Sequence, residues 1–173
     1  MHSKKDNHLK NLVSFFFVTG VFTGFSGTFI PAGGIQHLAW ALGAFFLIIG
    51  SSLLASKLSR QEHDIPAAGF SVFAVGQALA YGFLATNDAG SEQFGAVIAI
   101  YVPGLVLISF YDLTPWYFRL CGFFAAASFM TLAVLIFCHL QSEMLSSILN
   151  NSAYMAMNIM ILGWAWLVFK RKI

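Results

Sequence analysis

Residues 20–34 read GVFTGFSGTFIPAGG, with glycines at Gly20, Gly24 and Gly27 and a proline before the last two glycines. So many glycines form either a loop that cradles a phosphate or a helix face that packs closely against another helix. The stretch lacks the lysine and hydroxyl residue that end a P-loop, and no strand precedes it. The spacing of Gly20, Gly24 and Gly27 therefore predicts a helix-packing face, and residues 31–34 predict a turn.

The chain around this stretch is too apolar for a soluble domain. Of its 173 residues, 58% are hydrophobic and 9% are charged, whereas a soluble domain is about 25% charged. Six apolar runs are each near the roughly 20 residues that cross a bilayer, and they lack the period-two alternation of barrel strands. We expect an all-α polytopic membrane protein, a single six-helix domain over residues 1–173 with spans at 11–30, 36–56, 65–85, 94–111, 116–139 and 152–169.

The basic residues predict how this domain is oriented. All of them fall on one side of a six-span arrangement: Lys4, Lys5, Lys10, Lys57, Arg60, Arg119, Lys170, Arg171 and Lys172. The positive-inside rule makes that side cytoplasmic, which predicts a bacterial inner-membrane protein with both termini inside. Topology and contacts with anionic lipid headgroups account for the net charge of +2, so we expect the lipid bilayer as a partner and no nucleic acid.

The polarity inside the spans is uncharged. Pumps and voltage sensors keep an ionisable residue within the bilayer, but here the interior polar residues are Gln77, Tyr101 and Asn158. An unpaired amide in hydrocarbon costs several kcal/mol, so each should face a neighbouring helix or a wet cavity. We predict that the three residues line a pathway for a small neutral or monoanionic solute. The alternative is that they form hydrogen bonds that hold the helices together.

Two further patterns bear on a pathway. Phe22, Phe25 and Phe29 are spaced at i, i+3 and i+7, which predicts an aromatic face that can narrow a pore. Pro103 and Gly104 lie near the centre of the fourth span, at a position that matches the glycine run of the first. Interrupted helices at matching positions are typical of a 3+3 inverted repeat with a transport site. The alternative is that Pro103 only kinks its helix.

The sequence offers little support for a cofactor or for catalysis. His37 and His139 are expected near the outer ends of the second and fifth spans, where a pair of imidazoles could ligate haem or a metal. No HxxxH, HExxH or Cys/His cluster accompanies them, so we expect no bound cofactor. No nucleophile–base arrangement is visible either, and we do not expect an enzyme.

Three segments carry a family resemblance: GAFFLIIGSSLLASK at 43–57, AAGFSVFAVGQ at 67–77 and SEQFGAVIAIY at 91–101. With these segments and its loop lengths, the chain resembles the acetate uptake (succinate–acetate) transporter family. It departs from that family in lacking the N-terminal Asn-Pro signature and in carrying HDIPAAG where the family has Gly-Asn-Thr-Phe-Gly. The resemblance implies a six-helix oligomer, with both termini cytoplasmic, whose protomers each pass a small monocarboxylate by an aromatic constriction.

These observations favour a membrane channel or transporter for a small solute, such as acetate, that forms a homo-oligomer. A second hypothesis is a membrane scaffold or accessory subunit, in which the polar groups and small-residue faces serve helix packing and move no solute. A third is a haem- or metal-binding membrane subunit that uses His37 and His139.

Overall fold

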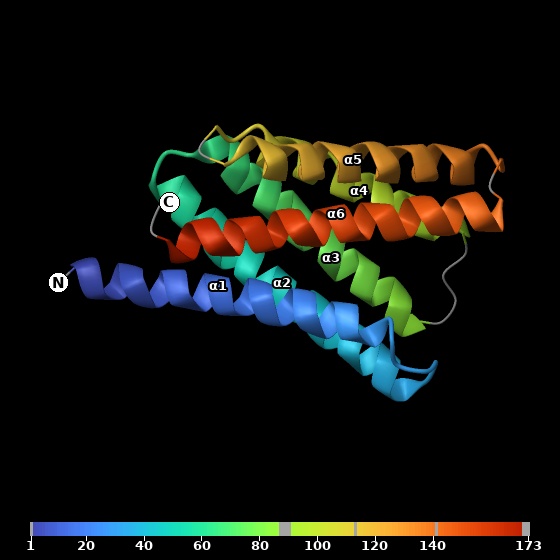
Figure 1. Ribbon diagram of the computed structural model, residues 1–173, viewed down its shortest axis with the longest axis horizontal. Helices are drawn as coiled ribbons and strands as arrows, with labels where there is room; N and C mark the ends of the chain where they lie inside the picture. The colour runs from blue at the N-terminus through green and yellow to red at the C-terminus, as the bar shows by residue number, and fades with distance from the viewer. Residues whose placement is uncertain (1, 87–90, 113, 141, 171–173) are drawn as a thin grey trace.

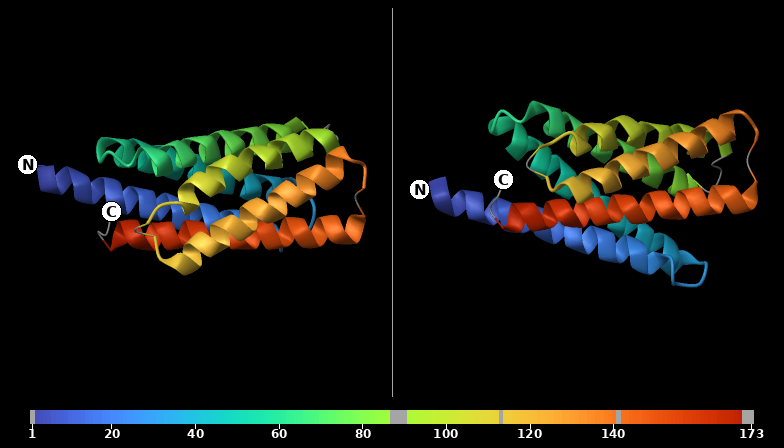
Figure 2. Two further views of the ribbon diagram at one scale, coloured as in Figure 1. Left: turned by 90° about the horizontal axis from the view of Figure 1, so that it is seen from above. Right: turned by 45° about the horizontal axis from the view of Figure 1, so that its top comes forward.

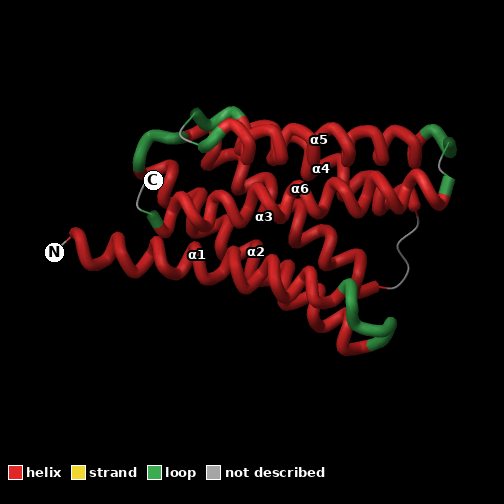
Figure 3. The backbone as a smooth tube through the Cα atoms, in the orientation of Figure 1, coloured by secondary structure: helices red, strands yellow, loops and turns green. Residues whose placement is uncertain are grey.

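The computed structural model is built from helices, and its described residues (2–86, 91–112, 114–140 and 142–170) contain no strand (Figure 3). Each helix is long and apolar enough to cross a membrane, which confirms the predicted all-α, multi-pass architecture. The helices are α1 (His2–Gly27), α2 (Gly34–Arg60), α3 (Asp64–Thr86), α4 (Ser91–Ser109), α5 (Trp116–Phe137) and α6 (Glu143–Phe169).

Two helices begin well before the apolar runs that predicted them. α1 begins at His2 instead of residue 11, and α6 begins at Glu143 instead of residue 152. At the start of α6 the Ser142 hydroxyl accepts a hydrogen bond from the Leu145 backbone N–H at 3.3 Å, and Glu143 adds a negative charge to the first turn. Both features stabilise a helix N-terminus, so the helix starts in polar sequence that hydropathy does not register.

The helices form a closed ring in which each packs against its neighbours in sequence and α6 packs against α1 (Figures 1 and 2). The even number of helices places the start of α1 and the end of α6 at the same end of the bundle. Lys57, Arg60, Arg119 and Lys170 also lie at this end, which we call the basic end. We call the opposite end, where α1 joins α2, the far end.

The predicted glycine face of α1 packs against α2. A Cβ atom added to Gly43 of α2 would lie 2.7 Å from the Cα of Gly24, and one added to Gly20 would lie 2.9 Å from Leu47. Gly27 similarly leaves room for the indole of Trp40. The backbones approach so closely that these positions accept only a hydrogen, as in small-xxx-small packing.

Gly104 serves the same purpose between α3 and α4. A Cβ atom there would lie 3.1 Å from the carbonyl oxygen of Gly69 and 3.2 Å from the backbone nitrogen of Phe73. Pro103 lies inside α4, which continues through it as a helix. Its side chain is exposed on the outer face of the bundle, where its ring displaces no buried neighbour. Neither α1 nor α4 is interrupted within the described residues, so the expected broken helices are not found there.

Candidate functional site

A cavity of about 570 Å³ lies inside the ring, in its far half. Five helices line it, through residues within 20–28 of α1, 40–47 of α2, 77–81 of α3, 94–101 of α4 and 150–158 of α6. The α1–α2 glycine contact supports one wall, because Gly20, Gly24 and Gly43 also line the cavity. The folding of α1 onto α2 therefore shapes this space.

The three polar residues singled out in the sequence meet at this cavity. Gln77 comes from α3, Tyr101 from α4 and Asn158 from α6, and all three line it. Gln77 is buried, and Tyr101 is completely so. The hydroxyl of Tyr101 is buried without a hydrogen-bond partner among the described residues. No hydrogen bond among the described residues joins these three groups to one another, although all three residues border the same space.

The aromatic face of α1 lies differently from its prediction. Phe25 lines the cavity, but Phe22 and Phe29 do not, and their side chains are 63% and 74% exposed. At 100° per residue Phe22 falls on the side of α1 opposite Gly20 and Gly24, which pack against α2, whereas Phe29 lies in the turn that follows the end of α1 at Gly27. Phe25 packs edge-on against Phe29, with ring centroids 5.1 Å apart. Of the predicted constriction, Phe25 alone lies at the cavity.

Several polar residues of the cavity were missed from the sequence. On α6 these are Asn150, Asn151 and Tyr154, and the other helices add Thr28, Trp40 and Tyr81. Asn150, Tyr154 and Asn158 are spaced at i, i+4 and i+8, which places them on one helix face. The spacing of four residues would have predicted this polar helix face if the sixth span had been extended back to residue 143.

The lining of the cavity combines polar groups with apolar side chains. Amide and hydroxyl groups come from α3, α4 and α6, including the side-chain oxygen of Asn150, which is buried without a hydrogen-bond partner in the part of the chain that the structure describes. Apolar side chains come from all five helices; examples are Val21, Leu47, Ala80, Val97 and Met157. The described residues of the lining include no aspartate, glutamate, lysine or arginine. As far as the structure describes it, the cavity is a largely apolar space with several amide and hydroxyl groups and no formal charge.

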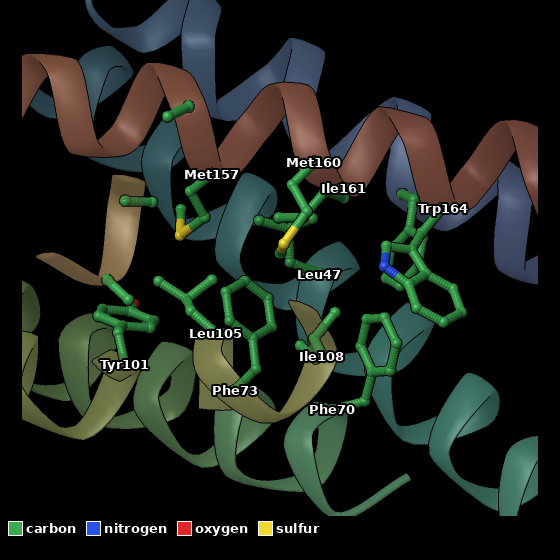
Figure 4. Packing of buried hydrophobic residues seen from close by; sticks show 14 of the residues in the cluster. Leu47, Phe70, Phe73, Tyr101, Leu105, Ile108, Met157, Met160, Ile161 and Trp164 are labelled. Atoms are coloured by element: carbon green, nitrogen blue, oxygen red, sulfur yellow. The ribbon is translucent and has the colours of Figure 1, made fainter. Parts of the chain in front are cut away.

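Packed side chains close the cavity toward the basic end. Phe73, Leu105, Met160, Ile161 and Trp164 are each at most 1% exposed, and Figure 4 shows the α6 side chains pointing toward those of α3 and α4. We call these five residues the plug.

Aromatic contacts extend the plug in both directions. On the cavity side, the ring of Tyr101 lies 5.6 Å from that of Phe73, measured between centroids. On the basic side, the indole of Trp164 lies 4.9 Å from the ring of Phe70 and 5.4 Å from that of Tyr111. Such ring pairs add about 0.5–1.5 kcal/mol each beyond their buried area. The cavity is therefore closed toward the basic end.

Along one side the cavity is bordered by exposed side chains of α1 and α6, where the two helices diverge. Near the basic end they are joined by the Ser14 hydroxyl, which donates a hydrogen bond to the backbone carbonyl oxygen of Ala165 at 3.0 Å. Farther along, the cavity lies between residues 20–28 of α1 and 150–158 of α6, and the two ribbons diverge toward the far end (Figures 1 and 2). At this side Phe25 and Met155 are 43% and 57% exposed.

The two histidines considered as ligands lie in exposed positions. His37 packs edge-on against Trp40, with ring centroids 5.8 Å apart. The Nε2 atom of His139 lies 3.9 Å from a carboxylate oxygen of Glu92, and both side chains are largely exposed. Among the described residues, no three histidine, cysteine, aspartate or glutamate side chains are grouped as they would be around a metal ion.

No protein-family model, curated protein or solved structure matches the chain.

Proposed function

We propose that the chain is a membrane transporter for a small solute and that the cavity is its solute site. One observation carries this proposal: Gln77, Tyr101 and Asn158 come from three different helices and converge on one space. An unpaired polar group inside a membrane costs several kcal/mol unless water or a solute satisfies it. Helix-to-helix hydrogen bonds, the alternative role, would have joined these groups to other helices instead.

The plug favours a carrier over an open channel, because it separates the cavity from the basic end. Three polar groups near it are buried without a hydrogen-bond partner among the described residues: the Trp164 indole N–H and the hydroxyls of Tyr111 and Thr114. Each such group costs about 1–3 kcal/mol. Opening of the basic end would hydrate them and so lower the free energy of the opened state. The described arrangement is then one of the two states of an alternating-access cycle.

The charge distribution gives this cycle a direction in the membrane. By the positive-inside rule the basic end is cytoplasmic, so the cavity lies in the half of the membrane away from the cytoplasm of a bacterial cell. The solute is neutral or monoanionic, since the described lining residues carry no charge that would pair with a multivalent ion. The resemblance to the acetate uptake transporters makes acetate the first solute to test and a homo-oligomer the expected assembly.

A scaffold or accessory subunit is the second candidate, and a surface groove favours it. Between α2 and α3 lies an open groove of about 700 Å³. Its lining is mostly small and includes Ser52, Ser56, Ala68, Ser71 and Ala78. Small residues let another membrane helix approach closely.

Measuring solute flux into proteoliposomes distinguishes a transporter from a scaffold or accessory subunit. We expect purified protein to accelerate the entry of radiolabelled acetate or of glycerol, a neutral solute of similar size. The variant Gln77→Leu should lose most of that flux while its melting temperature stays equal or rises, because the amide makes no hydrogen bond among the described residues that the change would break. Phe124→Leu is the matched control, since Phe124 lies on α5, is 55% exposed and does not line the cavity.

Transport would be rejected if neither solute entered faster than into empty liposomes, or if Gln77→Leu and Phe124→Leu reduced the flux equally. If the protein also co-purified with a stoichiometric membrane partner, the scaffold function would stand.

A further inference from the structure

The size of the cavity limits what it binds. Its volume of about 570 Å³ falls within the roughly 300–1,000 Å³ of sites for drug-sized ligands. Acetate is only a few times larger than a water molecule, whose share of liquid volume is about 30 Å³. Acetate would therefore leave most of this space to water, and the apolar wall formed by residues such as Val21 and Leu47 would remain hydrated at a cost.

The absence of charge from the described lining also disfavours acetate as the ligand. None of the described lining residues is cationic, and Lys57, Arg60, Arg119 and Lys170 all lie at the basic end, beyond the plug. A carboxylate that loses water without gaining a cation incurs a penalty of several kcal/mol. An uncharged molecule avoids that penalty.

The unpaired groups indicate which atoms the molecule carries. Gln77 of α3 and Asn158 of α6 line the cavity, and each amide can both donate and accept a hydrogen bond. The Tyr101 hydroxyl and the side-chain oxygen of Asn150 also lack partners among the described residues, but the protein encloses both atoms in this arrangement. Apolar side chains such as Val21, Leu47, Val97 and Met157 form much of the remaining lining. A ligand with one or two hydrogen-bonding groups on an apolar body matches this lining.

The opening between α1 and α6 provides access for such a molecule. This side of the cavity is bordered by the partly exposed side chains of Phe25 and Met155, and in a bilayer it faces hydrocarbon. A lipid-soluble molecule would reach the cavity from the membrane without crossing the plug.

From size, charge, hydrogen-bonding groups and access together, we infer that the cavity binds an uncharged amphipathic molecule of drug-like size in preference to a small carboxylate. The molecule carries a hydroxyl, amine or carbonyl group on an apolar body. This inference rests on the proposed function only in taking the same cavity as the solute site, and it replaces acetate with another class of solute.

A pair of fluorescent probes with the same ring system tests the inference. The detergent-solubilised protein is titrated with 1-aminoanthracene, which is uncharged at neutral pH, and with anthracene-1-carboxylate, which is anionic; empty micelles give the background. We expect saturable binding of the amine, at least tenfold weaker binding of the carboxylate, and no displacement of the amine by excess acetate. Energy transfer from tryptophan to the bound amine should fall in Trp40→Phe, because Trp40 lines the cavity.

Variants locate the binding. Gln77→Leu and Asn158→Leu should each weaken binding of the amine about three- to tenfold, as expected for one lost hydrogen bond, whereas Phe124→Leu should leave it unchanged. Two independent wall variants keep the test informative if one of them fails to fold, and melting temperatures identify such a failure.

The inference is overturned if the two probes bind equally well, if acetate displaces the amine, or if the amine binds no better than to empty micelles. Its failure is distinguishable from failure of the transport proposal. Acetate flux that depends on Gln77, without binding of the amine, would leave transport standing and reject this ligand class. Specific binding of the amine, without flux of any solute tested, would support the ligand class and reject transport.

Discussion

The two halves of the bundle are built from the same helices but are filled differently. In the basic half, side chains of the plug such as Phe73 and Trp164 occupy the centre and are fully buried. In the far half, the centre is a cavity bordered by amides, hydroxyls and apolar groups. The difference shows that the tightest packing and the open interior space are separated along the length of the bundle, so that a substitution in one half need not disturb the other.

The largest expected effect comes from removing a side chain from the packed half. Trp164→Ala should lower the free energy of unfolding by about 3–5 kcal/mol, because it leaves a void where Phe70 and Tyr111 now pack. Met155→Ala, at the edge of the cavity, should change it by about 0.5 kcal/mol or less, because that side chain is 57% exposed. Thermal unfolding in detergent, followed by circular dichroism, measures both. Equal losses would contradict the division into a packed and an open half.

A smaller effect is expected where backbones touch beside the cavity. Gly43→Ala should destabilise by about 1–3 kcal/mol, because the added methyl group meets the backbone of Gly24 at 2.7 Å and must push α1 away from α2. Gly82→Ala is the matched control: a Cβ atom there meets nothing within 4 Å, and alanine favours a helix by about 0.5–1 kcal/mol over glycine. The same unfolding assay compares them. If Gly43→Ala were as harmless as the control, the α1–α2 contact would not be the rigid wall described here.

The smallest predicted effect concerns the boundary between the halves. Ser14→Ala removes the hydrogen bond to the carbonyl oxygen of Ala165 and should cost about 1 kcal/mol. Because this bond lies where α1 and α6 begin to separate, its loss should also raise the labelling rate of a cysteine placed at Met155 by a maleimide reagent. Ser26→Ala is the control, since that exposed hydroxyl bonds only within α1. An unchanged labelling rate would show that other contacts hold the two helices together.

Much of the fold follows from hydropathy and helix spacing. Long apolar runs predict the helices, and the spacing of Gly20 and Gly24 predicts a close contact without naming its partner, Gly43. The limits appear where helices contain many polar residues: the segment from Glu143 to Asn151 mixes apolar and polar residues and was left out of the predicted span, yet it supplies Asn150 and Asn151 to the cavity. The orientation of Phe22 was also not predictable from the sequence, because it depends on which face of α1 packs against α2, and the end of α1 at Gly27, before Phe29, was not predicted either.

The sequence could single out individual polar residues of the candidate site, but it could not predict which residues meet there. A buried amide such as Gln77 needs a polar environment, so the sequence indicates that Gln77, Tyr101 and Asn158 matter. Whether they meet depends on which helices are neighbours, and six apolar segments permit many arrangements. The closed order of the ring, with α6 beside α1, brings the three residues to one space.

The glycine contact between α1 and α2 also has a mechanical consequence. Two helices that touch backbone to backbone tilt as one arm, and the bond between Ser14 and Ala165 marks a pivot close to the basic end. From Ser14 to Gly27 the arm is about 20 Å long at about 1.5 Å per residue. A rotation of about 10° about the pivot would move its far tip by about 3.5 Å. A modest tilt of this hairpin would thus widen or narrow the space between α1 and α6, and it would also shift the contact of α2 with α3.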